Sequence, residues 1–301
     1  MGAITASRCG PHADRIRAAT AAARNALGMR AGVDLMVAVL PLPARAGSSV
    51  PSWVTAAKPV LLASDVHLGA VRSGRERTFL AWLEHAAGVS SWIILNGDLF
   101  DFWFEYRWGT TRGHEDVLVV LRQIVASGVP VTLMGGNHDW WGGRFLRDEI
   151  GVEFLQDPVV REIAGRRALL AHGDGLGKGD YRYLMLRAVL RGRLTRAAFG
   201  LLPPTVGDGI ARGVSRTERK WDEWGERQQA RVSALEAWAT ERLGADPELE
   251  LVLLGHTHHP QVREVAEGKW YVNSGDWVLH RTYVTLEAGR EPRIAEWEGG
   301  A

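Results

Sequence analysis

The stretch Ser91-Trp92-Ile93-Ile94-Leu95-Asn96-Gly97-Asp98-Leu99-Phe100-Asp101 joins a short apolar run to an acidic turn that contains glycine. An apolar run of this length, bounded by turn residues, predicts a buried strand over 91–95. Ligands of open α/β sheets bind just beyond the carboxyl ends of such strands. We therefore expect Asp98 and Asp101 to lie at the ligand-binding edge of a sheet.

Four other places in the chain repeat this arrangement of an apolar run followed by a polar cluster. The clusters are Ser64-Asp65-Val66-His67-Leu68-Gly69, Gly135-Gly136-Asn137-His138-Asp139, Ala171-His172-Gly173-Asp174 and Gly255-His256-Thr257-His258. They are rich in Asp, His and Asn, and their glycines let the backbone approach a ligand closely. Five clusters at strand ends can therefore converge on one site.

The order of the expected elements predicts an α/β fold. Apolar runs at 60–64, 91–95 and 129–134 alternate with helical patterns at 75–87 and 116–126, which is typical of partly parallel sheets. Further strands are expected at 152–155, 159–163, 168–171, 249–254, 261–265, 270–273 and 281–286. A helical stretch at about 181–243 interrupts the strands. We therefore expect one catalytic domain over 58–297 with this stretch inserted as a helical cap.

Residues 1–57 differ in composition from the rest of the chain. They are rich in Ala, Gly and Arg and contain no glutamate, which favours a disordered extension. Two alternatives stay open: a start codon assigned too early, and a signal peptide from Met29 to Ala46 that Asp34 disfavours. The sequence has no apolar run of the roughly 18 residues that a membrane span requires. We therefore expect a cytoplasmic protein.

The clusters supply seven side chains of the types that bind divalent metals. They are Asp65, His67, Asp98, Asn137, His172, His256 and His258. Seven ligands exceed the needs of one tetrahedral ion and suit two ions about 3.5–4 Å apart. Imidazole nitrogen and carboxylate oxygen accept Mn, Fe, Zn or Ni, of which we favour Mn. The only cysteine is Cys9, which excludes a zinc site built from cysteines.

Each cluster taken alone has a simpler explanation. A single histidine is more often a packed, hydrogen-bonded residue than a metal ligand, and Asp98 alone could cap the turn that follows it. Five such clusters in one chain, each directly after an apolar strand, favour the metal site over these separate structural roles.

The set D-x-H, GD-x-x-D, GNHD, HGD and GHTH resembles the calcineurin-like metallophosphoesterase superfamily over residues 60–286. The resemblance implies a sandwich of two mixed β-sheets flanked by helices, with a dinuclear metal centre at one edge. It assigns one metal to Asp65, His67, Asp98 and His258. It assigns the other metal to Asp98, Asn137, His172 and His256, so that Asp98 bridges the pair.

The resemblance also implies a reaction. Members of the superfamily hydrolyse phosphate esters at their metals, so we expect a metal-dependent hydrolase. His138 corresponds to a histidine that contacts the phosphate or the leaving-group oxygen, and Asp101 is placed to orient it and keep it protonated. The alternatives are a structural role for His138 and, for the whole chain, a metal-bound scaffold without activity.

The residues around Asp101 narrow the resemblance. Phe102-Trp103-Phe104 follows this aspartate, whereas serine/threonine protein phosphatases have an arginine-glycine pair there. The stretch 96–103 and Asn273-Ser274-Gly275-Asp276-Trp277 resemble the branch of UDP-2,3-diacylglucosamine pyrophosphohydrolase of lipid A biosynthesis, which releases UMP and a lipid sugar 1-phosphate. His138 departs from that branch, which has arginine at this position. The alternative is a broad phosphomonoesterase or phosphodiesterase with another lipid or nucleotide substrate.

The expected cap has an apolar stripe with basic flanks. The stripe consists of Leu186, Val189, Leu190 and Leu194, which share one helical face. A stripe edged with arginine suits acyl chains and a phosphate, or an anionic membrane surface. The second possibility would place the protein on the inner face of the plasma membrane. The alternative is that the stripe packs on the core.

The expected substrate contacts lie in the cap and in one motif. They are Asn137, His138, Asp180, Arg187 and Arg191. Asp180 lies eight residues after His172, where the branch has a substrate-contacting aspartate, and Arg187 and Arg191 flank the apolar stripe. The net charge of +1 gives no reason to expect a nucleic-acid partner. No obligate protein partner is evident.

Overall fold

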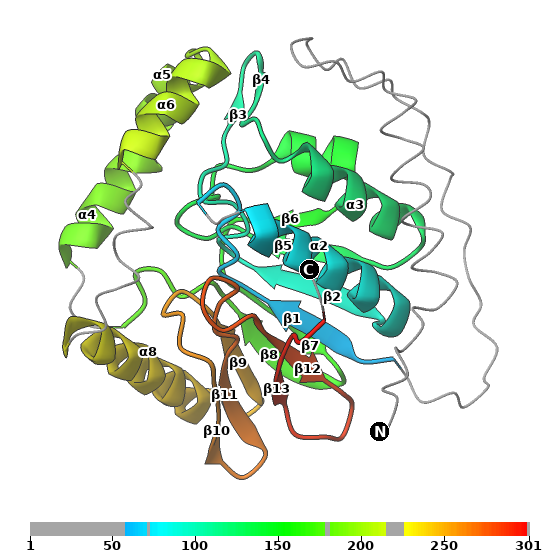
Figure 1. The fold of residues 1–301 in the computed structure, drawn as a ribbon. Helices are drawn as coiled ribbons and strands as arrows, with labels where there is room; N and C mark the ends of the chain where they lie inside the picture. Colours follow the sequence, from blue (N-terminus) through cyan, green and yellow to red (C-terminus); the bar gives the residue numbers. More distant parts are fainter. Residues whose placement is uncertain (1–57, 71–72, 178–180, 215–225, 300–301) are drawn as a thin grey trace, which may run out of the picture.

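Two mixed β-sheets form the centre of the computed structural model (Figure 1), which describes residues 58–70, 73–177, 181–214 and 226–299. The first sheet has the strand order β13-β12-β1-β2-β5-β6, and the second has the order β10-β11-β9-β8-β7. The strands of the first sheet are β1 (Val60–Ala63), β2 (Trp92–Asn96), β5 (Val131–Met134), β6 (Glu153–Leu155), β12 (Thr282–Leu286) and β13 (Arg293–Glu296). Those of the second are β7 (Val159–Ile163), β8 (Arg166–Leu170), β9 (Leu251–Leu254), β10 (Gln261–Ala266) and β11 (Lys269–Asn273).

The central strands of each sheet run parallel. In the first sheet β1, β2, β5 and β6 are parallel, and β12 pairs antiparallel with β1. In the second sheet β8, β9 and β11 are parallel, and β7 and β10 pair antiparallel at the edges. Parallel neighbours end at the same edge of a sheet. Each sheet therefore presents several loops at one edge.

Apolar side chains fill the space between the two sheets. Leu62 of β1 and Ile94 of β2 meet Leu170 of β8 and Leu253 of β9, and all four are fully buried. Alternate residues of a strand point to opposite faces, so each of these strands has another apolar set for its outer face. Each such side chain contributes roughly 1.5–3 kcal/mol on burial, and together they hold the sheets face to face.

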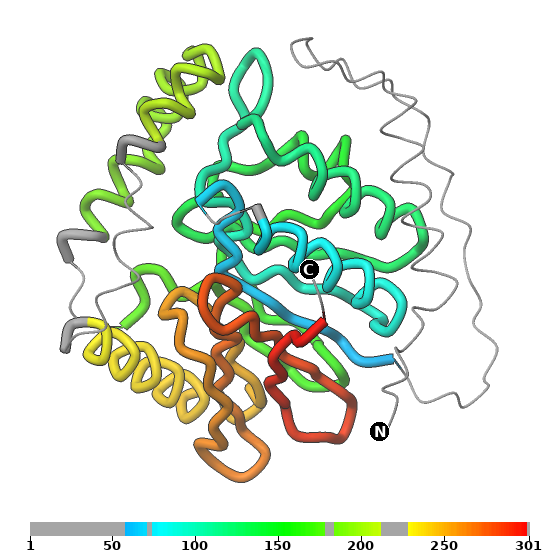
Figure 2. The backbone as a smooth tube through the Cα atoms, viewed as in Figure 1, coloured from blue at the N-terminus to red at the C-terminus, as the bar shows by residue number. Residues whose placement is uncertain are grey.

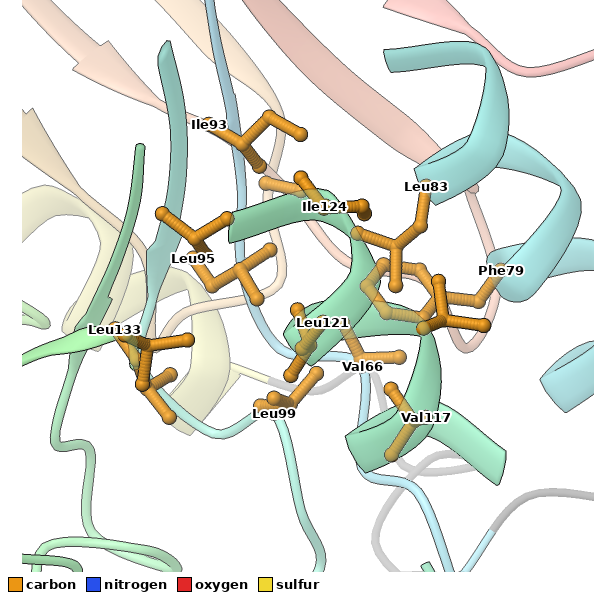
Figure 3. Packing of buried hydrophobic residues seen from close by; sticks show 14 of the residues in the cluster. Val66, Phe79, Leu83, Ile93, Leu95, Leu99, Val117, Leu121, Ile124 and Leu133 are labelled. Carbon is orange, nitrogen blue, oxygen red and sulfur yellow. The ribbon is translucent and has the colours of Figure 1, made fainter. Parts of the chain in front are cut away.

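Helices α2 (Ser73–Val89) and α3 (Glu115–Ala126) cover the outer face of the first sheet. Buried residues recur along α3 at helical spacing, at Val117, Leu121 and Ile124. Figure 3 shows these side chains gathered with those of the strands, including Leu95 and Leu133. The amphipathic pattern of α3 therefore directs one of its faces onto the sheet.

The inserted helical stretch has two parts with different surroundings. Helix α8 (Glu226–Ala245) buries Leu235, Ala239 and Leu243 against the second sheet, so it forms the outer layer there. Helices α4 (Tyr181–Leu190), α5 (Arg193–Gly200) and α6 (Pro204–Val214) instead form an arm beside the sandwich (Figure 2). Helix α8 thus packs as a layer of the sandwich, and the bounds 181–243 expected for the cap stay a prediction. The expected boundaries of the catalytic domain stay a prediction.

A short hairpin connects the arm to the sandwich. Its strands are β3 (Glu105–Tyr106) and β4 (Gly109–Thr110), and the Tyr106 hydroxyl donates a 2.9 Å hydrogen bond to Asp208 Oδ1 of α6. The rings of Phe104 and Phe199, from the hairpin side and from α5, lie 5.0 Å apart. These contacts tie α5 and α6 to the chain that follows Asp101.

The apolar stripe of the cap is exposed. Leu186, Val189 and Leu194 have exposed fractions of 55%, 62% and 87%. In the described chain the stripe is therefore not packed on the core, which was the alternative to a lipid-facing role. An exposed apolar patch of this kind is typical of an interaction surface.

The α/β sandwich of two mixed sheets confirms the expected fold class, and residues 1–57 lie outside the described part of the chain. Three elements were not expected: the β3–β4 hairpin, β13 and a π-helix, η1 (Phe145–Ile150). The hairpin strands are two residues long and β13 has only two apolar residues, Ile294 and Ala295. Such short segments carry too little periodicity to be recognised.

Candidate metal centre

Loops after β1, β2, β5, β8 and β9 carry the predicted ligands, and they meet where the two sheets end. Two hydrogen bonds between the sheets hold this edge together. Asn96 Nδ2, at the end of β2, donates to the carbonyl oxygen of Ala171 (2.9 Å), and the backbone N–H of His256 donates to Asp65 Oδ2 (2.9 Å). The five clusters therefore form one site, as the strand order requires.

Most predicted ligands have a left-handed backbone conformation. The residues with positive φ are Asp65 (55°), His67 (50°), Asp98 (52°), His256 (68°) and His258 (55°). This conformation is uncommon for residues other than glycine and concentrates at functional sites, where the surroundings must hold it. Asp139 supplies part of that support, because its carboxylate accepts hydrogen bonds from the backbone of Leu99 (2.7 Å) and Gly136 (2.7 Å).

The predicted ligands form two adjoining groups. In the first, His258 Nε2 lies 3.4 Å from Asp65 Oδ1, and the rings of His258 and His67 stack with centroids 5.2 Å apart. In the second, His172 Nε2 lies 3.2 Å from Asp98 Oδ2, with His256 beside it. Asp98 Oδ2 is also 3.9 Å from His67 Nε2, so Asp98 lies between the groups.

Several oxygen and nitrogen atoms of the site are available to bind a cation. Asp65 Oδ1 and Asn137 Oδ1 are buried and accept no hydrogen bond from the described residues, an arrangement that is costly without a counterpart. His172 Nδ1 contacts the carbonyl oxygen of Asn96 (2.9 Å), which can only accept, so Nδ1 carries the proton. The lone pair of His172 is therefore on Nε2, which faces Asp98. This donor set fits divalent metal ions.

The protonation states also suit metal binding. Burial lowers the pKa of His67, and burial together with His172 lowers the pKa of His256 to about 4. Burial alone would raise the pKa of Asp98, but His172 and the other surrounding histidines hold it well below its ordinary value. These shifts favour neutral His67 and His256 and an ionised Asp98, which are the forms that bind metals. Burial alone would lower the pKa of His172 and His258, but nearby carboxylates outweigh it and raise both, so metal binding at these two rings would release protons.

His138 lies beside the first group rather than within it. Its Nδ1 contacts the backbone carbonyl oxygen of Asp101 at 2.7 Å and lies 3.5 Å from Asp101 Oδ1. The His138 backbone N–H donates to Asp98 Oδ1 (2.9 Å), and its ring meets that of His67 edge-on at 4.7 Å. Because the carbonyl can only accept, Nδ1 is the protonated nitrogen and Nε2 is left for other partners.

A family model described as calcineurin-like phosphoesterase matches residues 58–260, a range that includes all seven predicted ligands. The chain belongs to this family. The expected family is thereby confirmed, and the protein is a metal-dependent hydrolase of the calcineurin-like phosphoesterases. In the described residues, no helix combines the length and hydrophobicity that crossing a membrane would need.

Relatives named UDP-2,3-diacylglucosamine hydrolase are similar to most of this phosphoesterase. The protein of Porphyromonas gingivalis is 28% identical over 248 residues, which cover 76% of this chain and 94% of that protein. The protein of Pseudomonas putida is 30% identical over 231 residues, covering 72% and 90%. Among solved structures, Vacuolar Protein Sorting 29 from Cryptosporidium parvum has a TM-score of 0.40 at 16% identity, covering 80% of this chain and 97% of that one.

The predicted substrate contacts of the cap have partners within the protein. Arg187 Nη1 donates to the backbone oxygen (2.7 Å) and Oδ2 (3.2 Å) of Asp174, and Arg191 Nη2 donates to the same Oδ2 (2.9 Å). Two basic side chains of the cap thus share the single carboxylate of Asp174, two residues after a predicted ligand. Contact of Arg187 and Arg191 with a substrate stays a prediction, and Asp180 lies outside the described residues.

Asp276 is a residue of the site that the predicted set does not contain. It is fully buried, and its Oδ2 lies 3.4 Å from His258 Nδ1 and 3.1 Å from His280 Nδ1. Its Oδ1 accepts the backbone N–H groups of Val278 (2.8 Å) and Leu279 (2.6 Å). The Asp276 carboxylate contacts Nδ1 of His258 and so orients the ring. Nε2 of His258, whose lone pair can bind a metal, then points toward Asp65. Asp276 could have been found in the sequence, because it lies in a polar turn that follows a sixth apolar strand, β11.

We expect the Asp276→Asn variant to bind Mn²⁺ about 10–100-fold more weakly, the usual effect of losing such a supporting carboxylate. Asparagine keeps an oxygen for the backbone N–H groups, but its amide nitrogen would donate to His258 Nδ1. The His258 proton then moves to Nε2, which can no longer bind a cation. Titration calorimetry with Mn²⁺ measures the affinity, and thermal unfolding checks the fold.

His280→Gln is the matched control for Asp276→Asn, because it removes the other histidine from the same carboxylate and leaves His258 in place. We expect it to keep the wild-type affinity for Mn²⁺. Equal affinity of Asp276→Asn and the wild-type protein would exclude an orienting role for Asp276.

Proposed function

We propose that this phosphoesterase hydrolyses the pyrophosphate bond of UDP-2,3-diacylglucosamine and releases UMP and a lipid sugar 1-phosphate. The observation that carries the proposal is the attachment of the cap to the metal loops. Arg191, the residue that follows α4, donates to the carbonyl oxygen of Gly136 (3.3 Å), next to the predicted ligand Asn137. An apolar arm fastened beside a phosphoesterase centre suits a phosphate ester with long acyl chains. The names of the relatives support the same substrate.

Two divalent metal ions, for which Mn²⁺ is our choice, complete the proposed site. One ion would be held by Asp65, His67, Asp98 and His258, and the other by Asp98, Asn137, His172 and His256. Bound metals supply positive charge for the phosphoryl oxygens and lower the pKa of water toward neutrality. The chain contributes a rigid set of donors, since hydrogen bonds to Asn96 and Asp276 fix the orientation of His172 and His258.

His138 is the proposed proton donor or phosphate contact. With Nδ1 held by the Asp101 backbone oxygen, its Nε2 can hold a proton at the leaving-group oxygen. The Asp101 carboxylate, 3.5 Å from Nδ1, helps to hold the ring in this orientation. Asp101 thus acts as a positioning residue, as the sequence predicted for it.

The exposed stripe of α4 and α5 is the proposed surface for the acyl chains. Met185, which is 73% exposed, extends it at the start of the stripe, and Leu194 at its other end is 87% exposed. Full burial of one such side chain against a lipid contributes roughly 1.5–3 kcal/mol. The same stripe would suit the interface of an anionic membrane, from which a lipid substrate is drawn, and this would place the protein peripherally on its inner face.

Release of UMP from UDP-2,3-diacylglucosamine by the Mn²⁺-loaded protein tests the proposal. UDP-N-acetylglucosamine is the matched control, because it contains the same pyrophosphate without long acyl chains. We expect kcat/KM to be at least about tenfold higher for the lipid, because even one methylene in an apolar site changes discrimination by about 10–200-fold. Absence of UMP, or equal turnover of the two compounds, would contradict the proposed substrate.

A broad phosphodiesterase is the second candidate, and His138 is the observation that favours it. The lipid A branch is expected to have arginine there, whereas His138 is a smaller group whose Nδ1 is occupied by Asp101. Such a site imposes fewer fixed contacts on the phosphate. Fast hydrolysis of bis(p-nitrophenyl) phosphate without UMP release from the lipid would favour this second function.

A further inference from the structure

A cleft with a volume of about 520 Å³ lies between α5 and the loop that follows His138. Its volume is in the range of small-molecule sites, which is about 300–1,000 Å³. Four arginines line it: Arg144, Arg147, Arg193 and Arg196. None of the residues that line it belongs to the candidate metal groups found among the described residues. The cleft is thus a second concave site with its own chemistry.

The arginines of this cleft leave an excess of positive charge. Within the described chain, Arg147 and Arg193 have no carboxylate at ion-pair distance, and Arg144 has only a 3.6 Å contact with the exposed Asp148. Glu105 also lines the cleft, but its carboxylate accepts backbone N–H groups. Several guanidinium groups around one cleft give it a positive potential, which attracts anions.

Two aromatic residues of the lining lie close in sequence to the catalytic loops. Phe104 and Trp141 both line the cleft, with ring centroids 6.3 Å apart. Phe104 is three residues after Asp101, and Trp141 is three residues after His138. Guanidinium forks hold phosphoryl oxygens bidentately, and aromatic faces accept flat rings or apolar groups. The cleft therefore favours a molecule that carries both a phosphoryl group and a flat or apolar part.

We infer that the cleft binds an organic phosphate, with its phosphoryl group on Arg147 and Arg193 and its organic part against Phe104 and Trp141. The site acts by binding alone, since no bond is made or broken in it. Two sources share this chemistry: a remote part of the substrate, which rests on the proposed function, and a separate phosphorylated molecule. The phosphoryl group is the feature that both sources share.

Binding of AMP to the Mn²⁺-loaded full chain tests the inference, with adenosine as the ligand control. AMP should slow modification of Arg147 and Arg193 by phenylglyoxal, read by mass spectrometry, whereas adenosine should not. The exposed Arg290 and Arg293, which pair with Glu287, should be modified at the same rate with and without AMP. Equal modification of Arg147 and Arg193 in the presence and absence of AMP would overturn the inference.

Matched double variants give an independent measurement. We expect Arg147→Gln with Arg193→Gln to bind AMP at least about tenfold more weakly, since the phosphoryl group would lose its charge-assisted hydrogen bonds to both guanidinium groups. Arg290→Gln with Arg293→Gln has the same change in charge and should bind AMP as the wild-type protein does. Equal binding by both double variants would also contradict the site.

Addition of UDP-2,3-diacylglucosamine distinguishes the two sources. If the lipid displaces AMP, measured by equilibrium dialysis with labelled AMP, the cleft holds part of the substrate, and if AMP stays bound, the cleft holds a separate molecule. Either result supports the anion site. The modification assay does not depend on turnover, so it can succeed even if no UMP is released, and the two proposals can fail separately.

Discussion

We expect the Asp98→Asn variant to lose hydrolytic activity by at least about 10³-fold, the scale reached when one preorganised electrostatic group is removed. Asp98 is the only predicted ligand assigned to both metals, and its Oδ2 lies 3.2 Å from His172 Nε2 and 3.9 Å from His67 Nε2. Asparagine keeps an oxygen for the His138 backbone N–H, so the loop is retained. The amide removes the negative charge between the two groups, which two cations would otherwise share.

Metal content and activity should fall together in this variant. We expect elemental analysis to give fewer than two metals for each chain, while circular dichroism stays that of the wild-type protein. Asp157→Asn is the control, because Asp157 is an exposed carboxylate after β6 and takes no part in the metal groups. An Asp98→Asn protein that keeps both metals and full activity would refute the proposed bridge and the mechanism built on it.

The ligands could be predicted because their positions follow from the sheet itself. Each one directly follows a parallel strand, and parallel strands deliver their ends to one edge. The apolar runs before Asp65, Asp98 and His256 were long enough to be recognised as strands, so the polar residues after them were expected at one edge, where the structure brings them together. The left-handed backbone of these residues could not be predicted, since it depends on hydrogen bonds from distant loops, such as those that Asp139 accepts.

Contacts between segments that lie far apart in the chain could not be predicted from the sequence. The pairing of Arg187 and Arg191 with Asp174 needs the position of α4 relative to the β8 loop, which no local pattern encodes. The arginine cleft likewise joins α5 to the loop after His138. Helix α8 looked like part of the cap, because an amphipathic helix has the same periodicity whether it covers a sheet or extends an arm. Tertiary packing decides whether such a helix covers a sheet or extends an arm.

The Gly136→Ala variant is expected to lose most of its metal binding through the addition of one methyl group. A Cβ at Gly136 would collide with Asp98 Oδ1 and would lie 2.6 Å from the backbone nitrogen of Asp98 and 2.8 Å from its Cγ. The backbone of Asp98 cannot retreat easily, because its carbonyl oxygen accepts the N–H groups of Val66 and His67. The carboxylate must therefore shift, which displaces the proposed bridge between the metals.

We expect the affinity of Gly136→Ala for Mn²⁺ to fall about 10–100-fold and its free energy of unfolding to fall by about 1–3 kcal/mol, the usual cost of overpacking. Gly88→Ala is the matched control: a Cβ there meets nothing within 4 Å inside α2, and alanine in a helix gains about 0.5–1 kcal/mol over glycine. Metal titration and denaturant unfolding measure both quantities. A Gly136→Ala protein that is destabilised but binds metal normally would show that the methyl group disturbs packing alone, and that the exact position of the Asp98 carboxylate does not limit metal binding.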